Sequence, residues 1–119
     1  MSARELDRQP EELAHFPDDR FRWLMLHDKE TPYAYCAFAE YRDTLEIHVS
    51  FVRWGPRVRR CVHGDVAWLK QEARRLGKNR IMGVRIDGSG EFDPNLFRFA
   101  SLYGFTDQCV LQTATLEVH

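Results

Sequence analysis

A strand pattern and a helix pattern follow each other directly in residues 44–77, TLEIHVSFVRWGPRVRRCVHGDVAWLKQEARRLG. Over residues 44–52, apolar and polar side chains alternate, which is the period of a β-strand. The polar face of this strand carries the titratable residues Glu46 and His48. From Val58 onward, apolar residues recur at spacings of three and four, which predicts a helix that packs on the sheet and ends at Gly77 in a left-handed cap.

Turn-forming residues separate further apolar segments on both sides of this stretch. The predicted elements are, in chain order, a short helix at 11–15, strands at 22–27, 33–41 and 44–52, the long helix, a strand at 80–87, a helix with Asp93 as N-cap, Pro94 as first residue and Gly104 as stop, and a strand at 110–118. Hairpins come first and a strand-helix-strand crossover comes later. The expected fold is therefore of the α/β (α+β) class, with a mixed sheet and helices against it.

The length of 119 residues and a hydrophobic content of 44% fit one domain with one core. We expect a single domain over residues 1–119, with a short N-terminal helical segment at 1–20 and the sheet and helices at 21–118. The first residues lack the apolar core of a signal peptide, and no stretch approaches the roughly 20 apolar residues that span a bilayer. The odd number of cysteines fits free thiols in a reducing compartment, so we expect a cytoplasmic protein without membrane contact.

Basic residues cluster locally although the whole chain is nearly neutral. The 17 basic and 18 acidic residues give no bulk attraction to nucleic acid, which is not an expected main partner. Residues 53–80 nevertheless contain nine Lys or Arg against two acidic residues. The arginines nearest the start of the long helix are Arg53, Arg57, Arg59 and Arg60. Because a helix start offers unbonded N–H groups to an anion, this junction is the predicted ligand site, with a solvated basic face as the alternative.

In two places the chain resembles the GCN5-related N-acetyltransferase (GNAT) family. The family pattern V-x-P-x-x-R-G-x-G-x-G/A, followed by an apolar helix ending A-x-x-x-G, is similar to this sequence at Val52, Arg57, Ala73 and Gly77. A second family pattern, a helix ending F-Y-x-x-L-G-F, resembles FASLYGF at residues 99–105. The resemblance covers about residues 21–118 in element order. It implies a GNAT-like mixed, mostly antiparallel sheet with a central splay, flanked by helices.

The resemblance further implies that acetyl-coenzyme A is the co-substrate and lies where the two central strands splay apart. Its pantetheine would bond to the backbone near Phe51 and Val52, and its pyrophosphate would rest on the amides near residues 57–62. The implied cofactor-binding residues are Phe51, Val52, Arg57, Val58, Arg59, Arg60, Cys61 and Val62. At the family's glycine positions this chain has Val58, Arg60 and Val62. These side chains would block the pyrophosphate or rearrange the loop, or Arg60 would supply the charge instead.

The reaction implied by the resemblance is transfer of the acetyl group to an amine of a small molecule or a protein. Glu46 matches a strand glutamate that acts as general base in some family members, and His48 lies on the same strand face. The tyrosine that protonates the leaving thiolate in the family corresponds to Ala100 here. Tyr103 on the next turn is therefore the candidate general acid. A solvent-side charge for Glu46 and a core position for Tyr103 are the alternatives.

Two other functions compete with an acetyltransferase. The missing loop glycines and Ala100 favour a catalytically degraded binding or structural module of the same fold, as occurs among accessory and bacteriophage proteins. The basic residues at 53–80 favour, as a second alternative, a small nucleic-acid binder. No metal site is expected, because Cys61 and His63 lack a second ligand pair at zinc-site spacing. A homodimer is expected, because few residues remain after Gly104 to complete the sheet and an exposed sheet edge favours self-association.

Overall fold

The structure, a computed structural model, describes residues 3–16, 20–84, 94–106 and 114–118. Its elements are β1 (Ala3–Leu6), the 3-10 helix η1 (Glu11–Leu13), β2 (Arg22–Asp28), β3 (Thr31–Tyr41), β4 (Thr44–Phe51), α1 (Pro56–Arg75), β5 (Arg80–Gly83) and α2 (Pro94–Ser101). They belong to two compact units, residues 1–86 and residues 87–119, each of which is described by itself. The combination of a sheet with helices confirms the predicted α+β class.

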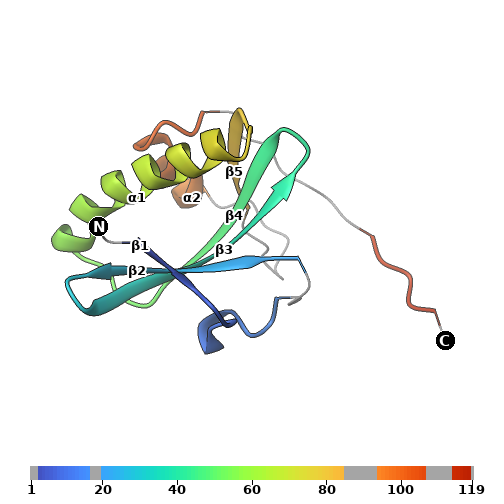
Figure 1. The fold of residues 1–119 in the computed structure, drawn as a ribbon, viewed down its shortest axis with the longest axis horizontal. Coiled ribbons are helices and arrows are strands. Elements are labelled where there is room, and N and C mark those ends of the chain that lie inside the picture. Colours follow the sequence, from blue (N-terminus) through green and yellow to red (C-terminus); the bar gives the residue numbers. More distant parts are fainter. Residues whose placement is uncertain (1–2, 17–19, 85–93, 107–113, 119) are drawn as a thin grey trace. The chain divides into compact units, whose positions relative to one another are not determined.

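The strands of the first unit form one five-stranded sheet in the order β1-β2-β3-β4-β5 (Figure 1). The first four strands pair antiparallel with their chain neighbours, and β5 pairs parallel with β4 after the crossover through α1. The sheet is therefore mixed and mostly antiparallel, as predicted. Pairing between β4 and β5 reaches Ile47 opposite Gly83, whereas β4 itself continues to Phe51.

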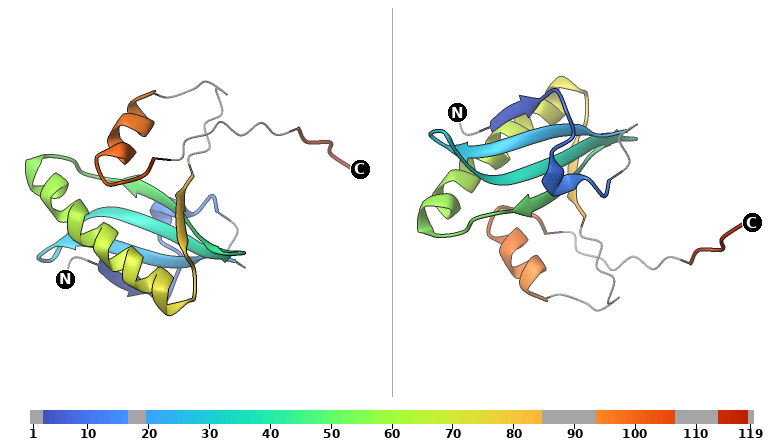
Figure 2. Two further views of the ribbon diagram at one scale, coloured as in Figure 1. Left: turned by 90° about the horizontal axis from the view of Figure 1, so that it is seen from above. Right: turned by 90° about the horizontal axis from the view of Figure 1, so that it is seen from below.

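Helix α1 covers one face of the sheet (Figure 2). Its buried residues recur at spacings of three and four and are Val58, Val62, Asp65, Leu69 and Ala73. On the sheet side, the ring of Phe38 meets that of Trp68 edge to face, with centroids 6.0 Å apart. The helix begins at Pro56, two residues before the predicted Val58, because proline suits a first helical position. Gly77 follows its end with φ of 74°, which confirms the predicted left-handed cap.

The N-terminal segment covers the opposite face of the sheet (Figure 2). Leu13 of η1 is 1% exposed and forms a core cluster with Trp23 and Ala37. The side-chain amide of Gln9 fixes this segment by donating to the carbonyls of Leu13 and Phe16, both at 2.8 Å. The short helix predicted at residues 11–15 is thus present as a single 3-10 turn. β1 was missed, because its four residues are too few to display a strand period.

A register shift in the β2–β3 ladder changes the direction of one side chain. Leu26 lies opposite Ala34 and His27 opposite Pro32, so Tyr33 is an extra residue in β3. Strict alternation predicts Tyr33 on the face of Tyr35, but its hydroxyl instead donates to Asp65 of α1 at 2.5 Å. The bulge thus places Tyr33 on the helix-covered face, where it is fully buried. Alternation alone gave the wrong face for this residue.

The predicted C-terminal strand is not present in the residues that the structure describes there. Residues 114–118 form neither strand nor helix and are exposed, and the earlier part of that prediction, residues 110–113, lies outside the described residues. The predicted N-cap Asp93 and strand residues 85–87 also lie outside them. The second predicted helix is confirmed as α2, which begins at Pro94. Among the described residues, no helix combines the length and apolar character needed to cross a lipid bilayer.

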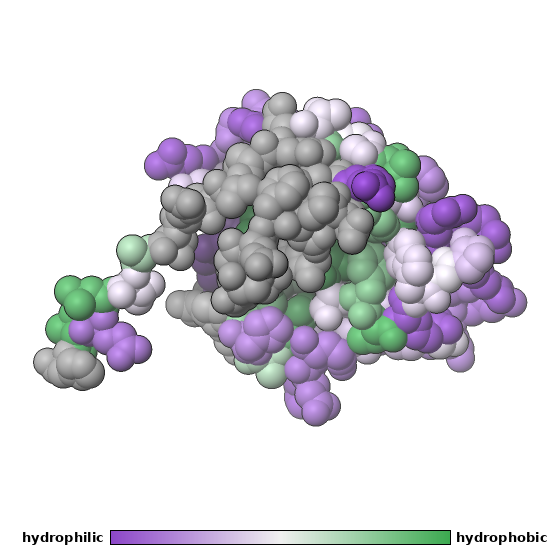
Figure 3. Space-filling view, turned by 180° about the vertical axis from the view of Figure 1, so that it is seen from behind, coloured by the Kyte–Doolittle hydropathy of each residue, from purple (hydrophilic) through white to green (hydrophobic). Residues whose placement is uncertain are grey.

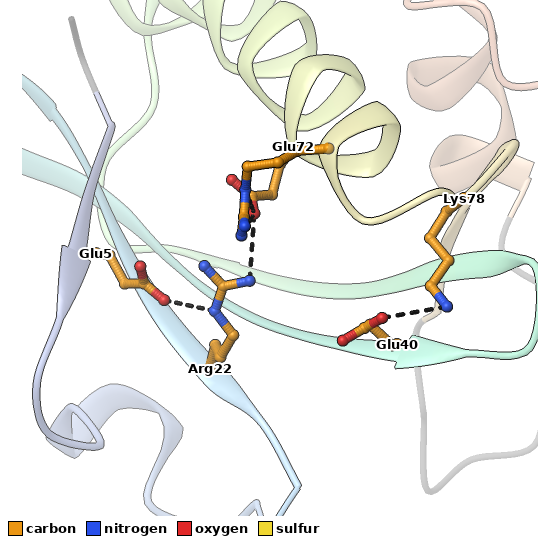
Figure 4. A network of polar contacts seen from close by, with 6 residues as sticks. Glu5, Arg22, Glu40, Glu72 and Lys78 are labelled. Carbon is orange, nitrogen blue, oxygen red and sulfur yellow. Dashed lines mark hydrogen bonds and ion pairs between the residues drawn. The ribbon is translucent and has the colours of Figure 1, made fainter.

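Ion pairs connect the sheet to α1 at its rim (Figure 4). Arg22 of β2 lies between Glu5 of β1 and Glu72 of α1, at 2.5 and 3.3 Å. Lys78, just after the helix, pairs with Glu40 of β3 at 3.2 Å. The Arg22 guanidinium therefore links three elements of the first unit.

Candidate functional site

β4 ends and α1 begins at the predicted ligand junction. Phe51 is exposed there, and its ring packs edge to face against Trp54, which is 53% exposed. Gly55 precedes the helix with φ of 156° and ψ of 176°, a conformation restricted essentially to glycine. No side chain among the described residues caps the helix start, and the first turn contains no acidic residue. The junction therefore presents the positive end of α1 without a carboxylate in that turn.

Few amides of this junction remain for an external acceptor. The N–H of Arg59 donates to the carbonyl of Gly55 at 2.9 Å, and later amides of a helix bond in the same way to the residue four positions earlier. The helix start thus offers the N–H groups of Arg57 and Val58, since Pro56 has none. The implied pyrophosphate contacts are confined to these two residues, because the amides of residues 60–62 lie inside the helix.

The backbone just after β4 is already bonded within the protein. The N–H groups of Val52 and Arg53 both donate to the carbonyl of Tyr33, at 2.9 and 3.2 Å. A pantetheine contact near Phe51 and Val52 would therefore need backbone groups other than these two amides. The hydrogen bonds also fix the path from β4 into α1 against the bulge in β3.

Some of the predicted cofactor-binding side chains are exposed at the junction, and others are buried or half-buried on α1. Arg59, together with Trp54, Gly55 and Pro56, lines an open pocket of about 210 Å³. Arg57 is exposed and holds Asp28 at 2.6 Å, whereas Arg60 is exposed next to it on the helix. Val58 and Val62 are buried against the sheet, and Cys61 is half-buried. Of the implied residues, the arginines are therefore the ones whose side chains can reach an anion.

Apolar surface surrounds the C-terminal half of β4. The exposed hydrophobic residues of this region are Val49, Phe51, Val52 and Trp54. On the face seen from behind, Figure 3 shows hydrophobic residues to the right of the centre and hydrophilic residues at the right-hand margin. The junction thus combines arginines with apolar surface, which suits a ligand that has both anionic and apolar parts.

Glu46 and His48 form a hydrogen-bonded pair on the sheet face that the N-terminal segment covers. His48 Nε2 lies 2.7 Å from Glu46 Oε2, and Arg20 donates to Glu46 Oε1 at 2.6 Å. Since a carboxylate can only accept, His48 Nε2 carries the proton and Nδ1 is the basic nitrogen of the neutral ring. The structure therefore brings these two predicted residues together and adds Arg20.

The surroundings of this cluster determine its acid–base character. Burial raises the pKa of Glu46, but the hydrogen bonds from His48 and Arg20 outweigh burial, and the net pKa lies below its ordinary value. His48 is 7% exposed, and its ring lies against the rings of Phe16 and Phe21 at 4.9 and 5.5 Å. Glu46 is thus a carboxylate that accepts a hydrogen bond from His48 and orients its ring.

Tyr103, the predicted acid, belongs to the second unit. It is buried there, its ring lies 5.2 Å from that of Phe99, and its N–H donates to the carbonyl of Ala100. The two predicted bases and the predicted acid therefore belong to different units, and the role of Tyr103 in a shared site stays a prediction.

No group of three or more side chains in the described residues is arranged to hold a metal ion. Of the cysteines, Cys36 is buried in the sheet, and burial raises the pKa of its thiol to about 12. This residue is therefore a core side chain and not a nucleophile.

No protein-family model matches the chain, and no curated protein matches it. The GNAT resemblance consequently stays a hypothesis that depends on the residues of this sequence.

Proposed function

We propose that the protein binds acetyl-coenzyme A at the junction of β4 and α1 and transfers the acetyl group to an amine. The observation that carries this proposal is the strand-helix-strand crossover β4–α1–β5, in which β4 and β5 pair parallel. Helix α1 of this crossover starts without a side-chain cap and without acidic residues in its first turn. The same proposal includes a GNAT-like fold, in which the two central strands of the mixed sheet splay apart.

The residues of the junction fit the anionic part of such a co-substrate. The N–H groups of Arg57 and Val58 lie at the helix end, and no atom would lie within 4 Å of a Cβ added at Gly55, so a phosphate can approach the backbone closely. Arg59 and Arg60 would supply positive charge where the family uses glycine amides. The pocket beside Trp54 would take an adenine ring against the indole.

Acetyl-coenzyme A would supply an acetyl thioester that is activated toward an amine. In this proposal, Nδ1 of His48 accepts the proton that the amine loses, and Glu46 stabilises the resulting imidazolium through Nε2. Arg20 keeps Glu46 ionised throughout, because it donates to the other carboxylate oxygen. Tyr103 would donate the proton that the departing thiolate needs.

A binding module without catalysis is the second candidate function. The observation in its favour is the burial of His48 beneath Phe16 and Phe21, which leaves 7% of the residue exposed. In this case the junction would still bind the coenzyme, and thiol release would be absent.

Isothermal titration of acetyl-coenzyme A, combined with a matched pair of variants, tests the binding site that both candidate functions share. Arg59→Ala with Arg60→Ala removes two positive charges at the start of α1, whereas Lys70→Ala with Arg74→Ala removes two exposed charges farther along the same helix. We expect micromolar binding by the wild type, a loss of at least about tenfold in the first variant and little change in the second, since each lost charged hydrogen bond is worth about 1.5–3 kcal/mol before solvent screening.

Absence of binding by the wild type would reject the proposed site altogether. If binding is present, free thiol measured with a panel of amines separates the two candidates: release supports the acetyltransferase, and no release with any amine supports the binding module.

A further inference from the structure

The outer face of α1 carries charge of one sign. The helix contains two acidic residues, and both are held inward. Asp65 is 4% exposed and accepts the hydroxyl of Tyr33, while the side chain of Glu72 is 11% exposed and pairs with Arg22 and Arg75. Within the part of the helix that faces solvent, no carboxylate therefore interrupts the basic residues.

The basic residues on this face form a stripe. Arg60, His63, Lys70 and Arg74, with Ala67 between them, follow one another at spacings of three, four, three and four residues, and all are exposed. Side chains at these spacings lie on one face of a helix. At about 1.5 Å per residue, the stripe is about 21 Å long. Three of its members, Arg60, Lys70 and Arg74, form no ion pair with the residues that the structure describes.

We propose that this stripe, from Arg60 to Arg74, binds the phosphodiester backbone of a nucleic acid. One strand presents a phosphate about every 3.4 Å along the axis, so about six phosphates pass along 21 Å of helix. The basic residues of the stripe can thus meet phosphates on both sides of Ala67. Binding of this kind positions the backbone and reads no base sequence.

The same observations disfavour an acidic protein as the partner. Stable protein interfaces have an apolar, often aromatic centre surrounded by a polar rim. The stripe has Ala67 at its middle and no large apolar side chain. A partner held by charge alone along a helix is typical of a nucleic-acid backbone and not of a protein interface.

This inference goes beyond the proposed function, and the two can fail separately. The proposed coenzyme site uses residues 57–60 at the helix start and so shares Arg60 with the stripe, whereas Lys70 and Arg74 lie about 20 Å or more along the helix from Arg57. Changes at Lys70 and Arg74 therefore test the stripe and leave the coenzyme site intact.

Fluorescence anisotropy with labelled single-stranded and double-stranded oligonucleotides at several salt concentrations tests the stripe directly. The test variant is Lys70→Glu with Arg74→Glu, and the control is Arg4→Glu with Arg8→Glu, which makes the same charge change at two exposed residues of the N-terminal segment. We expect binding whose log–log salt slope lies between about −2 and −4, for three to four phosphate contacts. The test variant should weaken binding at least tenfold and reduce the slope by about 2, while the control should retain the wild-type slope.

The strand type that binds more tightly identifies the preferred form of nucleic acid. No binding by the wild type, or equal weakening in the test and control variants, would overturn the proposal. Competition by polyglutamate as effective as that by the unlabelled oligonucleotide would also overturn it, in favour of an acidic polypeptide. Circular dichroism of each variant separates loss of binding from loss of fold.

Discussion

At the residue scale, Glu46 is a structural partner of His48 more than a base. Both of its oxygens accept hydrogen bonds from cationic or ring donors, from Arg20 and from His48. A carboxylate stabilised in this way gives up its negative charge reluctantly, which is why its pKa is lowered despite burial. Glu46 is therefore a poor proton acceptor, and its part in the cluster is to hold the His48 ring in place.

The lowered pKa of Glu46 predicts a pH-dependent stability. The ionised carboxylate should stabilise the folded protein above the ordinary pKa of 4.5, and this contribution should disappear as the pH falls through the lower folded-state value. Glu46→Gln should therefore cost about 1–3 kcal/mol of unfolding free energy at pH 7 and progressively less below pH 4.5. Urea denaturation at a series of pH values measures the difference.

Glu40→Gln is the matched control, because Glu40 forms an exposed ion pair with Lys78. Glu40→Gln should lower the unfolding free energy by at most about 1 kcal/mol. The stabilising role of the ionised Glu46 would be contradicted if Glu46→Gln lowered the unfolding free energy no more than Glu40→Gln does. A loss that stays constant down to low pH would contradict it as well.

The sequence predicted part of this cluster. Alternation along β4 placed Glu46 and His48 on one face, and this holds because β4 has no bulge. Arg20 could not be predicted, because it precedes β2 and reaches β4 across the sheet, a contact that depends on strand order. The direction of Tyr33 was also beyond the sequence, since nothing in its neighbours signals the extra residue of β3.

At the element scale, replacing two glycines of α1 and its start should change stability in opposite directions. Gly55 lies just before the helix with φ of 156°, whereas Gly64 lies inside it, and a Cβ added at either would meet no atom within 4 Å. We expect Gly55→Ala to lower the unfolding free energy by about 1–3 kcal/mol through backbone strain, and Gly64→Ala to raise it by about 0.5–1 kcal/mol. Thermal or urea denaturation of the two variants checks both signs, and a neutral Gly55→Ala would show that the helix start tolerates another backbone conformation.

The central elements and α2 were predicted from the sequence, whereas β1 was not and the strand expected at the end of the chain was wrong at residues 114–118. Residues 22–75 contain long periodic segments delimited by turns, so β2, β3, β4 and α1 were recognised from the sequence with small errors at their ends. β1 has four residues and no readable period. The alternation at residues 114–118 is a strand pattern, but no strand forms there in the structure, because a strand also needs a partner to pair with.

On the scale of the whole molecule, the N-terminal segment is part of the core and not an appendage. Leu13 is 1% exposed between the sheet and the rest of its segment. Leu13→Ala should therefore lower the unfolding free energy by about 2–5 kcal/mol. Leu102→Ala makes the same change at a residue that is exposed in the second unit, and it should change stability by less than about 0.5 kcal/mol.

Guanidinium denaturation followed by tryptophan fluorescence measures both variants, since Trp23 lies in the cluster around Leu13. Equal effects of the two substitutions would mean that the N-terminal segment contributes little to the stability of the sheet. The single domain expected over residues 1–119 is a separate matter that stays a prediction.

The order of the strands in the sheet has a consequence for how the chain is made. Because each of the five strands that the structure describes bonds to its neighbours in the chain, each new strand that leaves the ribosome finds its partner already synthesised. The four-stranded antiparallel part can grow one hairpin at a time, with short loops to close. β5 is the exception, since it reaches β4 after the 20 residues of α1. A nascent chain that has emerged as far as β4 thus contains every partner of the antiparallel sheet, whereas α1 and β5 can join only later.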